Sequence, residues 1–324
     1  MILSTLGIDI AKLKFNVCLL NPLGKLKHKV FPNTTLGFQQ LDAWLIKHGA
    51  PSVHACMEAT GVYGEALALH LHQAGHRVSV INPAAIKAFA GSRLSRTKTD
   101  RVDAELIARF CVAQQPPAWT PPAPEVRELQ ALVRRLEALT EMRVAEQNRL
   151  EAIIVVEAVR SSVEEHIAYL DRQIEQTRAA IRQHVNSHPG LRRQSELLDS
   201  IPGIAETTAA TLLAEITDIT QYQSARQVAA YAGLVPRERL SGSSVRGRTR
   251  LSKIGNARLR KALYFPAITA LRCSSFFQLW AKGLRERGKC KMSVIGAAMR
   301  KLVHLAYGVL KTGKPFDPEW AKTA

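Results

Sequence analysis

Cysteines are few in this chain, and none is arranged in a metal-binding or disulfide-forming pattern. The 324 residues contain five, and no CxxC pair occurs. They are Cys18, Cys56, Cys111, Cys273 and Cys290. Their odd number and scattered spacing indicate neither a zinc site nor a disulfide framework. We therefore predict a cytoplasmic protein with reduced thiols.

Long apolar runs are also missing. No run reaches the roughly 20 residues that a membrane-spanning helix needs. The N-terminus lacks the basic region, apolar core and small-residue cleavage site of a signal peptide. No basic amphipathic helix with an aromatic face stands out. The sequence thus predicts no membrane partner.

Negative charge is scarce in the last part of the chain. The net charge is +18 and the pI about 10.0. Residues 233–324 carry 20 Lys and Arg against 4 Asp and Glu, whereas residues 116–232 carry 12 against 16 and residues 1–115 carry 13 against 7. A concentrated positive field of this kind is typical of proteins that bind nucleic-acid phosphates.

Short apolar runs alternate with helical patterns over residues 1–115. Strands are predicted for LSTLGIDI, KFNVCLL, KLKHKVF, VHACME and HRVSVIN, and helices for TTLGFQQLDAWLIKHG, GEALALHLHQAG and KTDRVDAELIARF. Thr34 or Thr35 opens the first helix and Gly49 closes it. Strands and helices in this order predict an α/β domain with one sheet.

A proline-rich break, PPAWTPPAP, ends that domain at residues 116–124. From Glu125 to about His188 apolar residues follow helical spacing without Gly or Pro, which predicts two long helices with a turn near residues 160–162. Such a hairpin would mediate self-association or act as a spacer, and a helical bundle within one chain is the alternative. The predicted domains are therefore 1–115, 116–190 and 191–324.

The segment DSIPGIAETTAATLLAEI, residues 199–216, has the pattern of a helix-hairpin-helix. A Pro-Gly turn precedes a helix whose first amides are free to hold a phosphate without reading base sequence. Plain packing of two helices around a glycine is the alternative interpretation.

Four carboxylates in the first third of the chain have the arrangement of a two-metal nuclease. Asp9 lies in an apolar run and Glu58 ends another, while Asp100 and Asp103 lie three residues apart on a predicted helix, so they share a helix face. Carboxylates on strand ends and one helix can converge on two Mg²⁺ ions roughly 4 Å apart. The alternative is that each is a cap, a surface residue or an ion-pair partner.

Residues 231–264 combine serines with a dense set of basic residues. Ser241, Ser243 and Ser244 lie in a predicted Gly-containing loop. The basic residues that we predict to contact nucleic acid are Arg246, Arg248, Arg250, Lys253, Arg258 and Arg260. Arginines can neutralise an attacked phosphate through bidentate contacts, but a serine nucleophile also needs its proton removed. The block has no histidine and no GxSxG elbow, so a hydrolase triad is not indicated. A flexible basic loop that only touches a nucleic-acid backbone is the alternative.

Taken together, GIDIAK, MEATG, VINPAAIKAFA, KTDRVDAELIARF, SIPGI, AGLVPR and SGSSVRG resemble the DEDD transposases of the IS110 insertion-sequence family. These are bridge-RNA-guided recombinases related to the Piv-type DNA invertases, and the resemblance spans about residues 5–315. It implies an α/β RNase H-like (RuvC-like) domain, a long helical coiled-coil hairpin and a mainly α transposase domain with the helix-hairpin-helix. It also maps the family's acidic tetrad onto Asp9, Glu58, Asp100 and Asp103, and its nucleophilic serine onto Ser241.

The resemblance implies strand exchange through a phosphoserine bond, with Mg²⁺ held by the four carboxylates. The implied partners are donor and target DNA, a bridge non-coding RNA and further copies of the chain in a dimer or tetramer, so that the acidic and serine sites meet across subunits. The alternatives are a metal-dependent junction-resolving endonuclease, which needs no serine, a DNA invertase, and a nucleic-acid-binding protein without catalysis.

Overall fold

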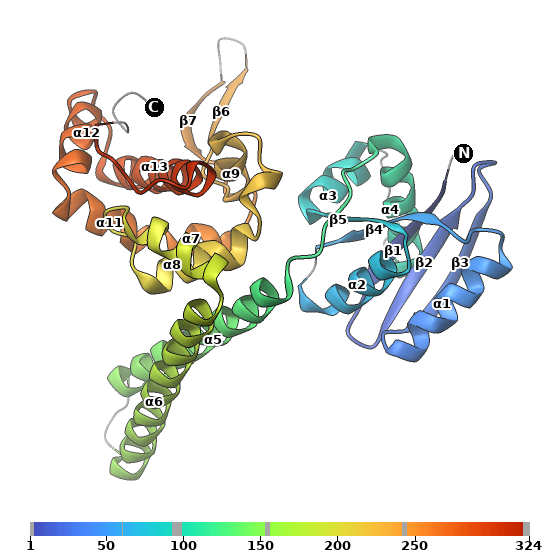
Figure 1. Ribbon diagram of the computed structural model, residues 1–324, viewed down its shortest axis with the longest axis horizontal. Coiled ribbons are helices and arrows are strands. Elements are labelled where there is room, and N and C mark those ends of the chain that lie inside the picture. Colours follow the sequence, from blue (N-terminus) through green and yellow to red (C-terminus); the bar gives the residue numbers. More distant parts are fainter. Residues whose placement is uncertain (1–2, 60, 93–98, 153–155, 242–244, 320–324) are drawn as a thin grey trace. The chain divides into compact units, whose positions relative to one another are not determined.

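The chain forms two compact units, Met1–Pro121 and Pro122–Ala324. The computed structural model describes residues 3–59, 61–92, 99–152, 156–241 and 245–319, and Figure 1 labels their helices and strands. A search of the described helices finds none with the length and apolar character needed to cross a membrane.

A mixed five-stranded sheet is the centre of the first unit, with the strand order β3-β2-β1-β4-β5. The strands are β1 (Ser4–Ile10), β2 (Lys14–Leu20), β3 (Leu26–Pro32), β4 (Val53–Glu58) and β5 (Arg77–Ile81). β1, β2 and β3 form an antiparallel meander, whereas β4 runs parallel to β1 and β5 parallel to β4. All five predicted strands are confirmed, and the first part of the chain is an α/β structure.

Four α-helices and one 3₁₀ turn connect or cover these strands. They are α1 (Thr35–Lys47), η1 (Val62–Gly64), α2 (Glu65–Gln73), α3 (Pro83–Ser92) and α4 (Asp100–Gln114). Thr34 is the residue that caps α1, because its side chain accepts a hydrogen bond from the Gly37 amide. A threonine at this position satisfies one of the amides that a helix start leaves unpaired.

The two faces of the sheet are covered by different helices. Alternate residues of a strand point to opposite faces, and Leu6 and Ile8 pack with residues of α1 and α2 in the largest apolar cluster of this unit. Gly7 lies on the other face, beneath α4. A Cβ added to Gly7 would overlap the main chain of α4 at Ala104 and Ala108. The missing side chain of Gly7 therefore allows α4 to lie directly against the sheet.

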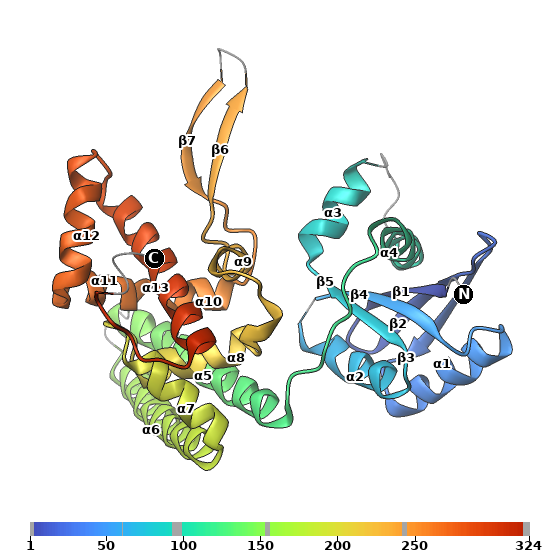
Figure 2. The ribbon, with the colours of Figure 1, turned by 45° about the horizontal axis from the view of Figure 1, so that its top comes forward.

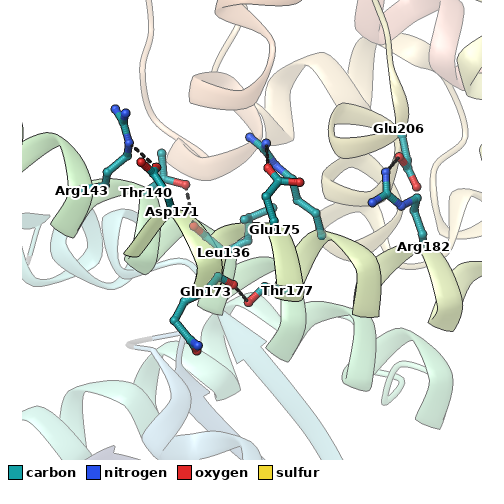
Figure 3. A network of polar contacts seen from close by, with 10 residues as sticks. Leu136, Thr140, Arg143, Asp171, Gln173, Glu175, Thr177, Arg182 and Glu206 are labelled. Carbon is teal, nitrogen blue, oxygen red and sulfur yellow. Dashed lines mark hydrogen bonds and ion pairs between the residues drawn. The ribbon is translucent and has the colours of Figure 1, made fainter. Parts of the chain in front are cut away.

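A long antiparallel helix pair begins the second unit. α5 (Pro124–Ala152) packs along α6 (Glu157–Ser187), with Leu129, Leu136 and Leu170 in the buried seam. Polar contacts link and stiffen the surface of the pair, among them Arg143 Nε, which donates to Asp171 at 2.6 Å (Figure 3). The two predicted helices are confirmed, and they pair within one chain.

The predicted turn near residues 160–162 is wrong, because α6 already begins at Glu157 and includes them. No Gly or Pro occurs there to end a helix, and the break falls between Ala152 and Glu157 instead. Residues 153–155 of this break lie outside the described residues.

The rest of the second unit is a mainly helical body with one two-stranded ribbon. Its elements are α7 (Pro189–Asp199), α8 (Glu206–Ile216), η2 (Ile219–Gln221), α9 (Ala225–Tyr231), β6 (Pro236–Ser241), β7 (Val245–Leu251), α10 (Ala257–Ala262), α11 (Tyr264–Cys273), α12 (Ser275–Glu286) and α13 (Lys291–Thr312). Buried residues of α13, including Leu302, Val303 and Ala306, lie in its core. This confirms the predicted, mostly helical C-terminal part.

The predicted helix-hairpin-helix corresponds to α7, the turn around Gly203 and α8. Gly203 has a φ of +90°, and a Cβ at this position would overlap the carbonyl oxygen of Pro266 in α11. The glycine thus allows both a left-handed backbone and a close approach to α11. This geometry favours the packing interpretation of the Pro-Gly turn, although it leaves the first amides of α8 at the surface.

Gly7→Ala should destabilise the first unit by about 3 kcal/mol, at the upper end of overpacking costs, because main-chain atoms of α4 rather than a flexible side chain occupy the space. Chemical denaturation of the full-length protein measures this. Gly91→Ala in α3 is the matched control, since a Cβ there meets nothing within 4 Å, and its free energy of unfolding should stay at or slightly above the wild-type value. Equal stability of the two variants would contradict the close approach of α4.

Candidate functional site

Asp9 and Glu58 lie side by side at one edge of the sheet. β1 and β4 are parallel neighbours with Ile8 opposite Met57, so the next residues along the two strands are Asp9 and Glu58. Gly7 and Cys56 lie on the face of the sheet that α4 covers. Asp9 and Glu58 follow them by two residues along the same strands, so both belong to that face. Each carboxylate is partly exposed.

The first turn of α4 brings Asp100 and Asp103 to the same face. Thr99 caps the helix, because its side chain accepts a hydrogen bond from the Val102 amide. α4 then passes over Gly7 at Ala104 and Ala108, which leaves its first turn above the carboxyl ends of β1 and β4. Asp100 Oδ2 accepts a hydrogen bond from Asn16 Nδ2 at 3.3 Å.

Asn16 connects the helix with Asp9. The antiparallel register pairs Asp9 with Asn16, and directly opposite residues project from the same face of a sheet. Lys14 Nζ, on the same face of β2, lies 3.4 Å from Asp100 Oδ2. The structure therefore gathers the four predicted carboxylates around one sheet edge, with Asn16 and Lys14 beside them.

Their side chains are not drawn together into a ligand cage. Among the described residues no group of three or more His, Cys, Asp and Glu side chains is arranged to hold a metal ion. Asp100 instead points to Lys14 and Asn16. The donor chemistry suits Mg²⁺, because all four side chains offer hard carboxylate oxygens from a sheet edge and a helix start.

The thiols of Cys18 and Cys56 are buried beneath this edge. Burial raises the pKa of Cys18 to about 12. A hydrogen bond with Cys111 and burial raise the pKa of Cys56 well above its usual range. Both thiols are therefore neutral near pH 7, and charge at the edge comes from the carboxylates and from Lys14.

The described residues on either side of the predicted serine loop form a two-stranded ribbon, and residues 242–244 lie outside the described residues. β6 and β7 pair antiparallel, with Pro236 opposite Leu251, Arg237 opposite Arg250 and Ser241 opposite Val245. The ribbon projects from the helical body of the second unit (Figure 2). Arg residues at every second position give this segment the period of a strand, a signal that its Gly and Ser content obscured.

Ser241 is the last residue of β6, close to the tip of the ribbon. Its backbone is described, as are those of Arg246 and Arg248 in β7, but their side chains are not. Ser243 and Ser244 lie outside the described residues. Their predicted roles stay predictions.

Two backbone hydrogen bonds anchor the base of the ribbon. The amide of Ser252 donates to the Val235 carbonyl at 2.8 Å, and the amide of Lys253 donates to the Gly233 carbonyl at 3.1 Å. Lys253 adopts a φ of +58°, a left-handed conformation that costs a non-glycine residue free energy and is seen mostly where the surrounding structure imposes it. The Lys253 and Arg250 side chains are exposed.

A buried carboxylate fixes the chain just after the ribbon. Asn256 Nδ2 donates to Glu215 Oε2 at 2.6 Å and to the Tyr231 hydroxyl at 3.1 Å, while its backbone amide donates to the Tyr231 carbonyl at 2.6 Å. Asn256 also caps α10 by accepting from the Leu259 amide. Glu215 is 8% exposed, so the hydrogen bond from this amide offsets part of the cost of burying its carboxylate.

Two of the basic residues after the ribbon make contacts within the protein. Arg258 Nε lies 3.1 Å from Glu137 Oε2 in α5, and Arg260 donates to the Ala232 carbonyl at 3.1 Å. Their side chains thus hold the fold together, and their predicted nucleic-acid contacts are not tested by this geometry. Sequence reasoning did not single out Lys14, Asn16, Glu215 or Asn256, because their importance follows from strand register and long-range contacts.

The chain was compared with known proteins. A DEDD transposase family model of the IS110 group matches residues 6–156, which include the four carboxylates, and the model described as "Transposase IS116/IS110/IS902 family" matches residues 195–280, which include the ribbon. The pilin gene-inverting protein of Moraxella bovis is 36% identical over 96% of this chain and 97% of its own length. The corresponding protein of Moraxella lacunata is equally similar. The transposase for insertion sequence element IS1328 of Yersinia enterocolitica is 28% identical over 78% of this chain and 82% of its own.

These matches define a class of DNA-recombining enzyme whose substrate is DNA. Within that class the chain belongs to the IS110 family of DEDD transposases, which includes the pilin gene-inverting proteins.

Asn256→Ala should destabilise the second unit by about 3 kcal/mol, because it leaves the buried Glu215 carboxylate without its amide donor. Thermal unfolding followed by circular dichroism should record a melting temperature lower by roughly 6–12 °C. Asn186→Ala, at an exposed position of α6, is the control and should be neutral. Adding Glu215→Ala to Asn256→Ala should recover part of the loss, since both buried partners are then absent. No recovery would contradict the proposed origin of the effect.

Proposed function

We propose that this protein exchanges DNA strands through a covalent bond between Ser241 and a DNA phosphate. The observation that carries the proposal is the gathering of four carboxylates at one sheet edge, from β1, β4 and the first turn of α4. Bringing four carboxylates together costs free energy through like-charge repulsion, and Lys14 Nζ, 3.4 Å from Asp100 Oδ2, offsets part of that cost.

The first unit would then be an RNase H-like (RuvC-like) catalytic domain. Its mixed sheet with β1 in the middle supports this assignment, as does the position of the acids at the carboxyl ends of parallel neighbours. The family model that matches residues 6–156 is named for such an acidic set.

Asp9, Glu58, Asp100 and Asp103 would together hold Mg²⁺, in a two-metal site. When bound, the ions would polarise the scissile phosphate and stabilise charge that develops on its oxygens. Lys14 would leave Asp100 as the carboxylates turn inward, and Asn16 would orient Asp100 through the hydrogen bond that it already donates. The thiols of Cys18 and Cys56, whose pKa values are raised, would stay neutral and would not compete as ligands.

Ser241 would be the nucleophile. Its Oγ would attack the phosphorus and lose its proton, a Ser–O–P bond would form, and the bond to one DNA oxygen would break as that oxygen leaves as a hydroxyl. One phosphate ester replaces another, so no phosphodiester energy is lost. A second DNA hydroxyl can then attack the phosphoserine and restore both the DNA strand and the serine without ATP. Arg246, Arg248 and Arg250 would neutralise phosphate charge during both steps.

The acidic and serine sites belong to different units of the chain. We propose that they meet across subunits of a dimer or tetramer. A bridge RNA would pair with donor and target DNA and supply sequence choice, while the protein contacts backbone and shape. Arg250, Lys253, Arg258 and Arg260 would then contribute charge, the last two after release from Glu137 and Ala232.

DNA inversion is a second candidate. Its support is the 36% identity with pilin gene-inverting proteins over 96% of this chain. Inversion and transposition share the same cleavage and rejoining chemistry and differ in the placement of the recombining sites. A plasmid with two candidate sites in inverted orientation would distinguish them, because inversion reorders the intervening segment without excising it.

Asp9→Asn should reduce DNA strand cleavage about 100-fold or more, since it removes one metal-binding charge while preserving side-chain shape. Binding of DNA and RNA should persist, because it depends on the basic second unit. Gel analysis of nicked products measures cleavage, and a filter-binding assay measures affinity. Asp199→Asn, the same chemical change at an exposed residue of α7, should behave as wild type. Full cleavage by both Asp9→Asn and Asp103→Asn would remove the tetrad from the mechanism.

Ser241→Ala should abolish the protein–DNA adduct that survives on a denaturing gel. Only one oxygen is removed, so stability should change by less than about 0.5 kcal/mol, and DNA affinity should be unchanged. Ser243→Ala and Ser244→Ala are the matched controls and should retain the adduct. If Ser241→Ala still forms the adduct and one of the two controls does not, the serine replaced in that control is the nucleophile. Full recombination by all three variants would overturn the phosphoserine mechanism.

A further inference from the structure

The connection between α12 and α13 presents four positive charges on a well-defined turn. Every residue from Arg285 to Ser293 is exposed. The basic turn, as we call this segment, carries Arg285, Arg287, Lys289 and Lys291. Its single acid, Glu286, is already within 3.9 Å of Lys282 in α12, so it does not offset the four.

The backbone of the basic turn is fixed. Gly288 has a φ of +75°, its amide donates to the Arg285 carbonyl at 2.8 Å, and the Lys289 amide donates to the Leu284 carbonyl at 3.1 Å. These two bonds close the end of α12 with a left-handed glycine. On the other side, the Val294 amide donates to the Cys290 carbonyl as α13 begins. The charges are therefore held between two helix ends, and binding would cost little backbone entropy.

These charges have no partner within the described part of the chain. No carboxylate is in ion-pair range of Arg285, Arg287, Lys289 or Lys291 there. Basic residues elsewhere in the same unit behave differently: Arg160, Arg178 and Arg192 each pair with a glutamate three or four residues away at 2.6–3.0 Å. Neighbouring like charges without partners repel each other and stabilise nothing in the free protein.

The start of α13 adds to the same positive field. This 22-residue helix begins at Lys291 with no acidic residue in its first turn and no side-chain cap hydrogen bond. Its unpaired N–H groups carry partial positive charge. By contrast, α4, which we assign to metal binding, has two aspartates in its first turn.

The composition of the basic turn defines the ligand. It contains no aromatic residue on which an unpaired base could stack, and it offers no carboxylate or amide side chain free to read base edges. Lys and Arg side chains next to a helix start contact phosphate oxygens without reading sequence. These features favour the regular phosphate backbone of a duplex.

We propose that the basic turn is a second, sequence-independent binding site for the phosphate backbone of double-stranded DNA, separate from the ribbon that carries Ser241. This inference rests on the proposed function to the extent that duplex DNA is the substrate. The basic turn holds DNA flanking the reacting phosphate and takes no part in the chemistry.

The test compares two triple variants of the full-length protein that remove equal charge. One is Arg287→Ala, Lys289→Ala and Lys291→Ala in the basic turn. The control is Arg160→Ala, Arg178→Ala and Arg192→Ala, whose partners are glutamates of the same helices. The Kd for a short DNA duplex of arbitrary sequence is measured at several KCl concentrations.

We expect the basic-turn variant to bind the duplex about 100-fold more weakly than wild type near 0.1 M salt, with the slope of log K against log salt reduced by about 3. The control should change the slope by less than about 1. Arg287→Lys should keep wild-type affinity, because lysine also contacts phosphate. The double variant Lys289→Gln and Lys291→Gln, a milder change, should reduce the slope by about 2.

Equal affinity and slope for the two triple variants would overturn the proposal. Loss of binding to a structured RNA with unchanged duplex DNA binding would also overturn it, in favour of an RNA site. Placing the two triple variants in the Asp9→Asn or Ser241→Ala protein, which should bind DNA without reacting, separates the binding site from the chemistry. Weaker duplex binding of the basic-turn variant in that protein supports the basic turn even if wild-type protein forms no covalent adduct. Absence of the adduct would overturn only the phosphoserine mechanism.

Discussion

The close approach of α4 to the sheet is the constraint on which the candidate active site depends. Gly7 has no side chain, so the main chain of α4 lies against β1 at Ala104 and Ala108. Any larger residue at that point would lift the helix and carry Asp100 and Asp103 away from Asp9 and Glu58. The same contact explains the small residues of α4 at its centre and the buried Cys18 beside them. The close packing of Ala104 and Ala108 against Gly7 thus sets the position of the two aspartates in the first turn of α4.

The second unit uses its charges in two ways. Glu137 and Glu141 of α5 neutralise Arg258 and Lys261, so part of the positive excess serves to attach α10 to the long helix pair. The basic turn and the exposed Arg250 and Lys253 keep their charge available. Net charge along the sequence therefore overstates the charge that a nucleic acid can meet, and the structure separates the two contributions residue by residue.

The sequence was most informative where local patterns decide the structure. Short apolar runs predicted all five strands of the sheet, and Thr34 caps α1 at one of the two predicted positions. It was less informative where distant residues decide. The break between α5 and α6 falls between Ala152 and Glu157 rather than at residues 160–162, and neither stretch contains a Gly or Pro that would mark it in the sequence. Arg258 could be predicted as a basic residue but not as a partner of Glu137, which is 121 positions away in sequence. The positions of Lys14 and Asn16 beside the carboxylates could be found only once the strand register was known.

The residue composition of the ribbon determines what the proposed reaction would need from the rest of the chain. Residues 231–264 include no histidine, and their only acid is Glu238. A serine hydroxyl needs both a route for its proton and stabilisation of charge on the phosphate. Arginines of the ribbon can meet the second need, but guanidinium groups stay protonated near pH 7 and cannot accept the proton. The chain's clustered carboxylates are in the first unit, at the edge formed by Asp9 and Glu58. In the proposed mechanism the hydroxyl of one unit therefore depends on the carboxylates of the other, and the ribbon becomes reactive only when DNA and a carboxylate edge are both present.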